Sequence, residues 1–130
     1  VADEDLISKN LSVYEFVSFH KGFFKNFIRP KYVGCCMAFR SELLNIALPF
    51  PKNIEWHDWY ISLIGELFYR CEIVSDKTIL FRRHSTNNSK TGMKTDRKIL
   101  KIMLSRMWMM HAIIVSIIRF FANKLSKEKS

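Results

Sequence analysis

The last quarter of the chain is one long, mostly apolar stretch that carries a narrow polar stripe. Polar and small residues recur there at three- and four-residue steps, which is the spacing of one face of an α-helix. The stripe consists of Lys94, Lys98, Lys101, Ser105, Ala112, Ser116, Arg119 and Asn123. The spacing predicts a helix from about Thr95 to Lys124, with a large apolar surface that must be covered by something.

That helix could meet a membrane, a partner domain or the core of the protein. Its uncharged run from Met107 to Ile118 has 12 residues, whereas about 20 are needed to cross a bilayer. We therefore expect no spanning helix. A helix half sunk in a membrane surface, or packed on a partner, fits the pattern, and a core helix of the intact protein fits it equally well.

The charge of the chain is placed unevenly. The formal net charge is +9 over 130 residues, and all of the excess lies in residues 66–130, since the basic and acidic residues of 1–65 cancel. Such an excess favours an anionic partner, although a solvated basic face explains it too. Basic residues over 82–101 are not interleaved with aromatic residues that could stack on bases, so nucleic acid is not an expected partner.

The cysteines and the first residues of the chain indicate in which cellular compartment the protein is expected. Cysteines at 35, 36 and 71 are odd in number, and two are adjacent, which makes a poor disulfide framework and fits no zinc spacing. Reduced thiols in the cytoplasm are expected. The chain begins at Val1 and shows no signal-peptide pattern, and we expect it to be a fragment of a longer protein.

The rest of the chain predicts both helices and strands. Apolar periodicity and a possible Ser41 cap predict three further helices, over 12–20, 42–47 and about 57–69. Short apolar runs predict three strands, over 32–39, 72–74 and 77–81. Gly34 inside the first strand suggests a close approach by a ligand or another backbone. The predicted fold class is therefore α/β, in the form of an α+β fragment.

One six-residue stretch, Glu55-Trp56-His57-Asp58-Trp59-Tyr60, combines acid, imidazole and aromatic groups at the start of a predicted helix. An aspartate in this position is an ordinary helix cap, favoured by the helix dipole. It can also be a general base that takes a proton from a substrate hydroxyl, with the aromatic residues as flat faces for a ring. The residues alone leave both interpretations open.

A second candidate stretch is the wholly polar segment 82–92. Arg82 and Arg83 offer planar donors, His84 a donor or metal ligand, and Asn87 a side-chain amide, which together could hold a phosphate. A solvated turn is the plainer interpretation. If the preceding strand continued, Arg83 and His84 would point to opposite faces.

Four motifs of this chain occur in an order that is typical of a known family. They are Gly34-Cys35-Cys36-Met37-Ala38-Phe39-Arg40, Leu48-Pro49-Phe50-Pro51, His57-Asp58-Trp59-Tyr60 and Leu80-Phe81-Arg82-Arg83-His84-Ser85-Thr86-Asn87. The series resembles the C-terminal half of glycosyltransferase family 2 enzymes of the GT-A fold, closest to the rhamnosyltransferase-like group of bacterial polysaccharide synthesis. The resemblance covers about residues 30–92.

The resemblance implies inverting transfer of a sugar from a nucleotide-diphospho-sugar to a hydroxyl of a glycan or lipid-linked acceptor. Asp58 corresponds to the general base, and His84 to a residue near the diphosphate or its divalent metal, Mg²⁺ or Mn²⁺. The expected substrate-binding residues are Gly34, Cys35, His57, Trp59, Arg82, Arg83 and Asn87.

The chain departs from the family pattern in two ways. Tyr60, Phe81 and Arg83 replace the usual Trp, Tyr and Gln. The nucleotide-binding half, whose DxD motif would hold most of the metal, is missing. We therefore expect residues 1–92 to be the acceptor-side portion of the enzyme and 93–130 an amphipathic helix with a basic tail. The expected location is cytoplasmic, at the inner face of the plasma membrane. The alternative function is a non-catalytic basic module that binds anions or a membrane surface.

Overall fold

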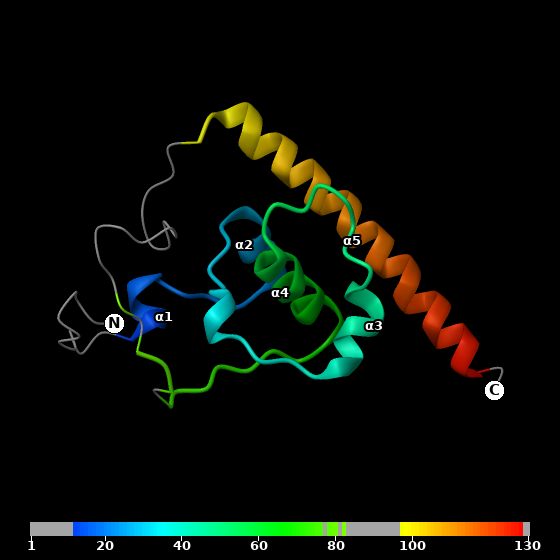
Figure 1. Cartoon of the computed structure of the whole chain (residues 1–130), viewed down its shortest axis with the longest axis horizontal. Coiled ribbons are helices and arrows are strands. Elements are labelled where there is room, and N and C mark those ends of the chain that lie inside the picture. Colours follow the sequence, from blue (N-terminus) through cyan, green and yellow to red (C-terminus); the bar gives the residue numbers. More distant parts are fainter. Residues whose placement is uncertain (1–11, 77, 81, 83–96, 129–130) are drawn as a thin grey trace.

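The computed structural model describes residues 12–76, 78–80, 82 and 97–128, and within these ranges it is helical (Figure 1). The α-helices are α1 (Val13–Phe16), α2 (Phe23–Ile28), α3 (Leu44–Ala47), α4 (His57–Phe68) and α5 (Ile99–Glu128). Two short 3₁₀ turns, η1 (Gly34–Cys36) and η2 (Ser41–Leu43), lie between α2 and α3. The prediction of a helix over 57–69 is confirmed, and the predicted C-terminal helix is confirmed from Ile99 onward, whereas residues 97 and 98 are not helical.

The predicted α/β fold class is wrong, because no sheet forms in the described part of the chain. The backbone of Val33 and Met37 is extended, but the turn η1 interrupts it between them. Residues 72–74 have no regular structure, and Arg82 alone forms an isolated bridge. A strand is stabilised by ladder hydrogen bonds to a neighbour, and extended segments without one do not become a sheet.

Two predicted helices near the N-terminal side differ from the observed ones. The helix expected over 12–20 is limited to α1, where Ser12 and Glu15 form a reciprocal capping box and Ser18 has a positive φ of 51°. A second helix, α2, then starts after Gly22, whose φ of 113° suits glycine. The helix expected over 42–47 is divided into η2 and α3. Ser41 makes no capping hydrogen bond there and is the first residue of η2.

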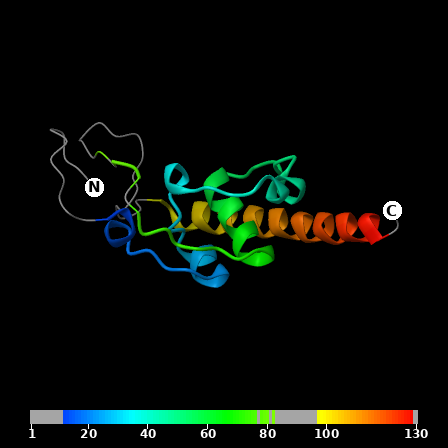
Figure 2. The same cartoon turned by 90° about the horizontal axis from the view of Figure 1, so that it is seen from below.

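Helix α4 lies at the centre of the molecule, with α2 on one side and α3 and α5 on the other (Figures 1 and 2). The buried core consists of Leu43, Ile46, Ala47, Trp59, Tyr60, Leu63, Ile64, Met109, Ala112 and Ile113. Burying a large apolar side chain stabilises a fold by about 1.5–3 kcal/mol. The core therefore fixes the first turn of α4, where the candidate site lies.

The second half of the polar stripe of α5, from Ala112 to Asn123, faces the body of the protein. Ala112 and Ser116 are fully buried, and the hydroxyl groups of Ser116 and Tyr60 are 2.6 Å apart. Arg119 donates to the carbonyl of Pro49 at 2.8 Å, and Asn123 donates to that of Asn45 at 3.0 Å. The small side chains let α5 approach α3 and α4 closely, and the polar side chains donate hydrogen bonds to backbone carbonyl groups in and after α3.

By length and composition α5 could cross a membrane over Ile99–Ser126. The expectation of no spanning helix considered only the uncharged run of 12 residues. With its few charged residues included, the helix still has the length and mean hydropathy that a spanning helix needs. A helix that packs in the core of a protein meets the same criterion, so its contacts with the body are needed to interpret it.

Candidate functional site

Asp58 is held at the start of α4 by two backbone N–H groups. One carboxylate oxygen, Oδ1, accepts from the N–H of Trp59 at 2.8 Å, and Oδ2 accepts from the N–H of Gly34 at 3.2 Å. The N-cap residue of α4 is Trp56, so Asp58 lies in the first turn, where a negative charge is favoured by the helix dipole. The half-buried carboxylate is thus fixed from two segments 24 residues apart.

Gly34 leaves no room for a side chain beside Asp58. A Cβ atom built on Gly34 would lie 3.1 Å from Asp58 Cβ and 3.3 Å from Oδ2. The close approach that the sequence suggested for this glycine therefore exists, and its neighbour is the candidate base. A side chain here would push the carboxylate aside by a few tenths of an ångström, because η1 brings the Gly34 backbone against it.

The loop of the second motif, Leu48-Pro49-Phe50-Pro51, also packs against the first turn of α4. The ring of Phe50 lies 4.8 Å from that of His57 and 6.0 Å from that of Tyr60. His57 itself is exposed at the start of α4. The motifs around Gly34 and Phe50 therefore both contact the motif that contains Asp58.

Trp59 lies in the core and not at the surface. It is only 2% exposed, and its indole N–H donates to the carbonyl of Asn26 at 2.9 Å. The guanidinium of Arg106 covers one ring face at 4.3 Å. In this structure Trp59 supports α4 and α2, while the exposed aromatic residue of the motif is Trp56.

The basic candidate residues are only partly described. Arg82 is exposed, whereas Arg83, His84 and Asn87 lie outside the described residues. Cys35 is exposed in η1, next to Gly34. Among the residues that the structure describes, no three His, Cys, Asp or Glu side chains converge on a metal site. The divalent cation and the role of His84 therefore stay predictions.

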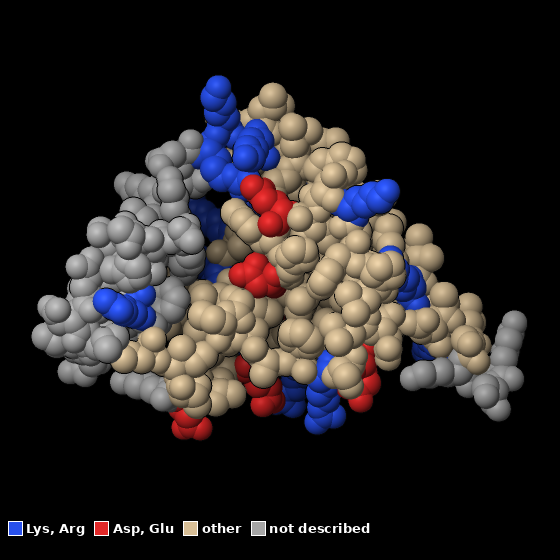
Figure 3. All heavy atoms as spheres, in the orientation of Figure 1, with Lys and Arg blue, Asp and Glu red and all other residues tan. Residues whose placement is uncertain are grey.

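A charged cluster that the sequence did not predict lies near the start of α5. It contains Arg97, which precedes the helix, Arg106 within it, and Glu55. Arg97 pairs with Glu55 and lies over the ring of Trp56 at 4.8 Å, and Arg106 covers Trp59. The hydrogen bond from Arg97 lowers the pKa of Glu55, and burial lowers the pKa of Arg106. Figure 3 shows acidic and basic side chains gathered where α5 begins. No local pattern signals these contacts, because 42 residues separate Glu55 from Arg97.

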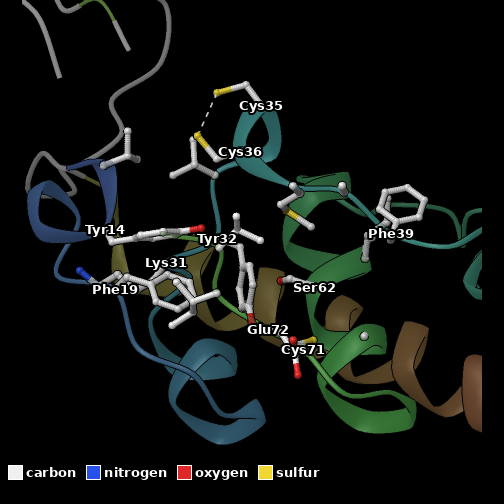
Figure 4. Close-up of a pocket in the computed structure, with 18 of the residues that line it drawn as sticks. Tyr14, Phe19, Lys31, Tyr32, Cys35, Cys36, Phe39, Ser62, Cys71 and Glu72 are labelled. Atoms are coloured by element: carbon white, nitrogen blue, oxygen red, sulfur yellow. Dashed lines mark hydrogen bonds between the residues drawn. The ribbon is translucent and has the colours of Figure 1, made fainter. Parts of the chain in front are cut away.

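A cavity of about 1220 Å³ opens beside η1 (Figure 4). It lies between α1, residues 31–43, one face of α4 and residues 69–80. Aromatic rings and thiols line it, among them Tyr14, Phe19, Tyr32, Cys36 and Cys71. Asp58 does not line this cavity, but Cys35 and Cys36, which follow Gly34, do. The cavity and the carboxylate therefore both adjoin η1, the cavity at Cys35 and Cys36 and the carboxylate at Gly34.

A half-buried polar contact holds one residue that lines the cavity, Tyr32. Glu66 accepts from the hydroxyl of Tyr32 at 2.5 Å and from the N–H of Gly22 at 2.9 Å. Burial, followed by the bond to Glu66, raises the pKa of Tyr32, and burial raises that of Cys71. Both groups therefore stay protonated at neutral pH. Glu66 was missed by sequence reasoning because its partners are 34 and 44 residues away.

The two adjacent thiols differ in their surroundings, since Cys35 is exposed and Cys36 is half-buried. The sulfur atoms of Cys35 and Cys36 are 3.8 Å apart, and burial, with the bond to Cys35, raises the pKa of Cys36 to about 11. Since the thiolate is the reactive form, Cys36 should alkylate at pH 8 on the order of a hundredfold more slowly than an ordinary thiol, whose pKa is about 8.5. Its rate should climb as the pH rises toward 11.

Mass spectrometry after timed iodoacetamide treatment measures these rates. A Cys35→Ser variant reports Cys36 and a Cys36→Ser variant reports Cys35, with Cys71 resolved on a separate peptide. If Cys36 reacted as fast as Cys35 at pH 8, the burial argument for its raised pKa would be wrong.

No protein-family model, curated protein or solved structure matches this chain. The resemblance to family 2 glycosyltransferases therefore depends on the four motifs, and it stays a prediction. What the structure adds is independent of any relative: the first motif contacts the carboxylate of Asp58 in the third, and the second motif packs against His57 beside it.

Proposed function

We propose that this chain is the acceptor-side part of an inverting glycosyltransferase, which moves a sugar from a nucleotide-diphospho-sugar to a hydroxyl acceptor in the synthesis of a bacterial cell-surface glycan. One observation carries the proposal: the carboxylate of Asp58 is held by the N–H of Gly34 and by that of Trp59. Residues far apart in the chain thus meet at one group that can take a proton. A rigid helix start is a suitable support for such a group.

The geometry of Asp58 leaves it able to act as a general base. Each carboxylate oxygen accepts one backbone N–H, and each has a second lone pair for an acceptor hydroxyl. As the acceptor oxygen bonds to the sugar carbon, its proton passes to Asp58, and the bond from that carbon to the diphosphate breaks. The two N–H donors keep the carboxylate in one orientation and reduce the cost of aligning it.

The leaving diphosphate needs positive charge as its bond breaks. In our proposal Arg82, Arg83, His84 and Asn87 supply donors for it, and Gly34, Cys35 and His57 shape the acceptor side, while buried Trp59 supports the first turn of α4. The described residues offer no three-ligand set for a divalent cation. We therefore assign Mg²⁺ or Mn²⁺ mainly to a nucleotide-binding partner half, and no step here depends on it.

The proposed location is the cytoplasmic face of a membrane, with a lipid-linked acceptor. The three cysteines form no disulfide, which fits a reducing compartment. The chain is basic, and its last helix has a long apolar surface, which suits an enzyme that acts on a membrane-held substrate.

A transfer assay tests the proposal on the full-length enzyme that contains this chain. The protein is incubated with a panel of nucleotide-diphospho-sugars and lipid-linked or free glycan acceptors, and release of the nucleoside diphosphate is measured. Release that depends on the acceptor is expected for at least one donor. Binding of anionic vesicles without any turnover across the panel would instead favour the non-catalytic module.

The Gly34→Ala substitution should lower transfer about tenfold and leave donor binding unchanged. Its methyl group would come within 3.1 Å of Asp58 Cβ, so the carboxylate must move by a few tenths of an ångström. Misplacing a reacting group by about 1 Å can cost about a hundredfold in rate, and this shift is smaller. Initial rates at saturating donor, with donor binding measured by calorimetry, check the prediction.

Gly65→Ala is the matched control. Its methyl group would lie 3.3 Å from the sulfur of Cys71 and 3.7 Å from Leu43. That change crowds the protein to a similar degree without touching Asp58. Equal loss of transfer in both variants would show that general packing, and not the position of Asp58, determines the rate.

A further inference from the structure

The face of α5 that points away from the body is apolar from Ile99 to Leu125. Eleven large apolar side chains between Ile99 and Leu125 are exposed. Six of them at three- to seven-residue steps are Leu100, Met107, Ile114, Ile118, Phe121 and Leu125. At 1.5 Å per residue this surface is about 37 Å long, far more than a scatter of single exposed side chains.

This outer face is also free of charge. With 3.6 residues per turn, the Lys, Arg, Asp and Glu residues between Ile99 and Leu125 all fall outside it, and His111 is its one ionisable group. The ring of His111 meets that of Trp108 edge-on, with centroids 6.3 Å apart. The apolar arc covers about half of the helix surface, wider than the narrow seam of a coiled coil.

Exposed cations border this face. Helical geometry places Lys101 at one edge of the apolar arc and Lys124 at the other, and both are exposed. Long basic side chains in this position can rest their stems on apolar surface while the ammonium groups reach phosphate headgroups. Basic side chains recur along the flank on which α5 lies (Figures 1 and 3).

The inner face ties the helix to the body along much of its length. Arg106 donates to the carbonyl of Ile28 at 2.7 Å, near the start of α5, while Arg119 and Asn123 bond to carbonyls of residues 45–49 near its end. If α5 crossed a bilayer, these polar groups and the attached body would have to enter hydrocarbon or separate, leaving carbonyls unpaired.

From these observations we propose that α5 lies in the plane of an anionic lipid bilayer, with its outer face sunk to the level of the headgroups and upper acyl chains and its inner face still packed on the body. This surface is independent of the chemistry proposed for Asp58. A neutral apolar half with cations at both edges matches the layered polarity of a membrane interface.

Vesicle flotation of the full chain tests the proposal. Vesicles of phosphatidylcholine with phosphatidylglycerol should bind the chain, and vesicles of phosphatidylcholine alone should bind it more weakly. A Met107→Glu/Ile114→Glu variant should bind at least about tenfold less. Ile73→Glu/Val74→Glu adds the same charge at exposed positions outside α5 and should bind as the unchanged chain does. Circular dichroism confirms that each variant folds.

The orientation of the helix is tested on the bound chain. Lys101 and Lys124 are about 34 Å apart along the helix at 1.5 Å per residue. A membrane-impermeant amine reagent, added outside the vesicles, should label both, because both edges of an in-plane helix face the same side. Protection of one of them would show that α5 crosses the bilayer and would overturn the in-plane arrangement.

Two other results would overturn the proposal. One is the absence of vesicle binding together with a dimer in sedimentation that the Met107→Glu/Ile114→Glu change disrupts, which would assign the face to a second copy of the chain. The other is equal binding by that variant and by its control. Asp58→Asn should leave vesicle binding unchanged, so failure here is separable from failure of the proposed transferase activity.

Discussion

Replacing Asp58 with asparagine should lower the rate of sugar transfer by about 10²–10⁴-fold, the usual contribution of a positioned general base. Asparagine has nearly the same shape, and its carbonyl can accept one of the two backbone N–H groups that Asp58 binds. It cannot take the proton of the acceptor hydroxyl. Donor binding should persist, because in our proposal Asp58 meets the acceptor and not the diphosphate.

The assay for Asp58→Asn pairs initial transfer rates with donor binding on the same protein preparation. Asp76→Asn is the matched control, since it makes the same chemical change at an exposed aspartate. Thermal melting of both variants separates a lost base from a disturbed fold. Transfer at the unchanged rate would disprove the base assignment, whatever happens to stability.

Replacing Trp59 with alanine should lower the free energy of unfolding by about 3–5 kcal/mol, as is typical for a buried tryptophan. The side chain is 2% exposed and its N–H binds the carbonyl of Asn26, which would lose its partner. The guanidinium of Arg106 would also lose the ring that it covers. Urea denaturation, followed by circular dichroism, measures the change.

Trp56→Ala is the matched control for Trp59→Ala. Trp56 also lies beneath an arginine, Arg97, but it is 41% exposed. Its removal should change the free energy of unfolding by no more than about 1 kcal/mol. If Trp59→Ala kept its stability and lost only acceptor affinity, the packing role argued here would be wrong and the predicted acceptor contact would gain support.

Local patterns predicted some elements of this fold well and others poorly. The helix over 57–69 was predictable because its periodicity of four places Trp59, Leu63 and Leu67 in one row, independently of any other segment. The strands were not, because a strand requires a partner and short apolar runs do not identify one. The turn η1 at Gly34 replaces the expected strand.

The candidate site was predictable only in part. The sequence motifs pointed to Gly34 and Asp58, and these two residues are in contact in the structure. Trp59 was grouped with them by adjacency in sequence, yet consecutive helix residues point in different directions, and this side chain turns into the core. Glu66 and Arg106 were not expected, since their contacts span 34 and 78 residues.

The sequence by itself determined that the last helix exists and has one polar and one apolar face, because both follow from local spacing. Only the tertiary structure decided which face meets the body. The second half of the polar stripe turns inward, because Ser116 finds Tyr60 while Arg119 and Asn123 find carbonyls at the end of α3 and in the loop after it. The buried hydroxyl group of Ser116 would cost free energy if left unpaired. Satisfying these polar groups inside the protein leaves the apolar face outside.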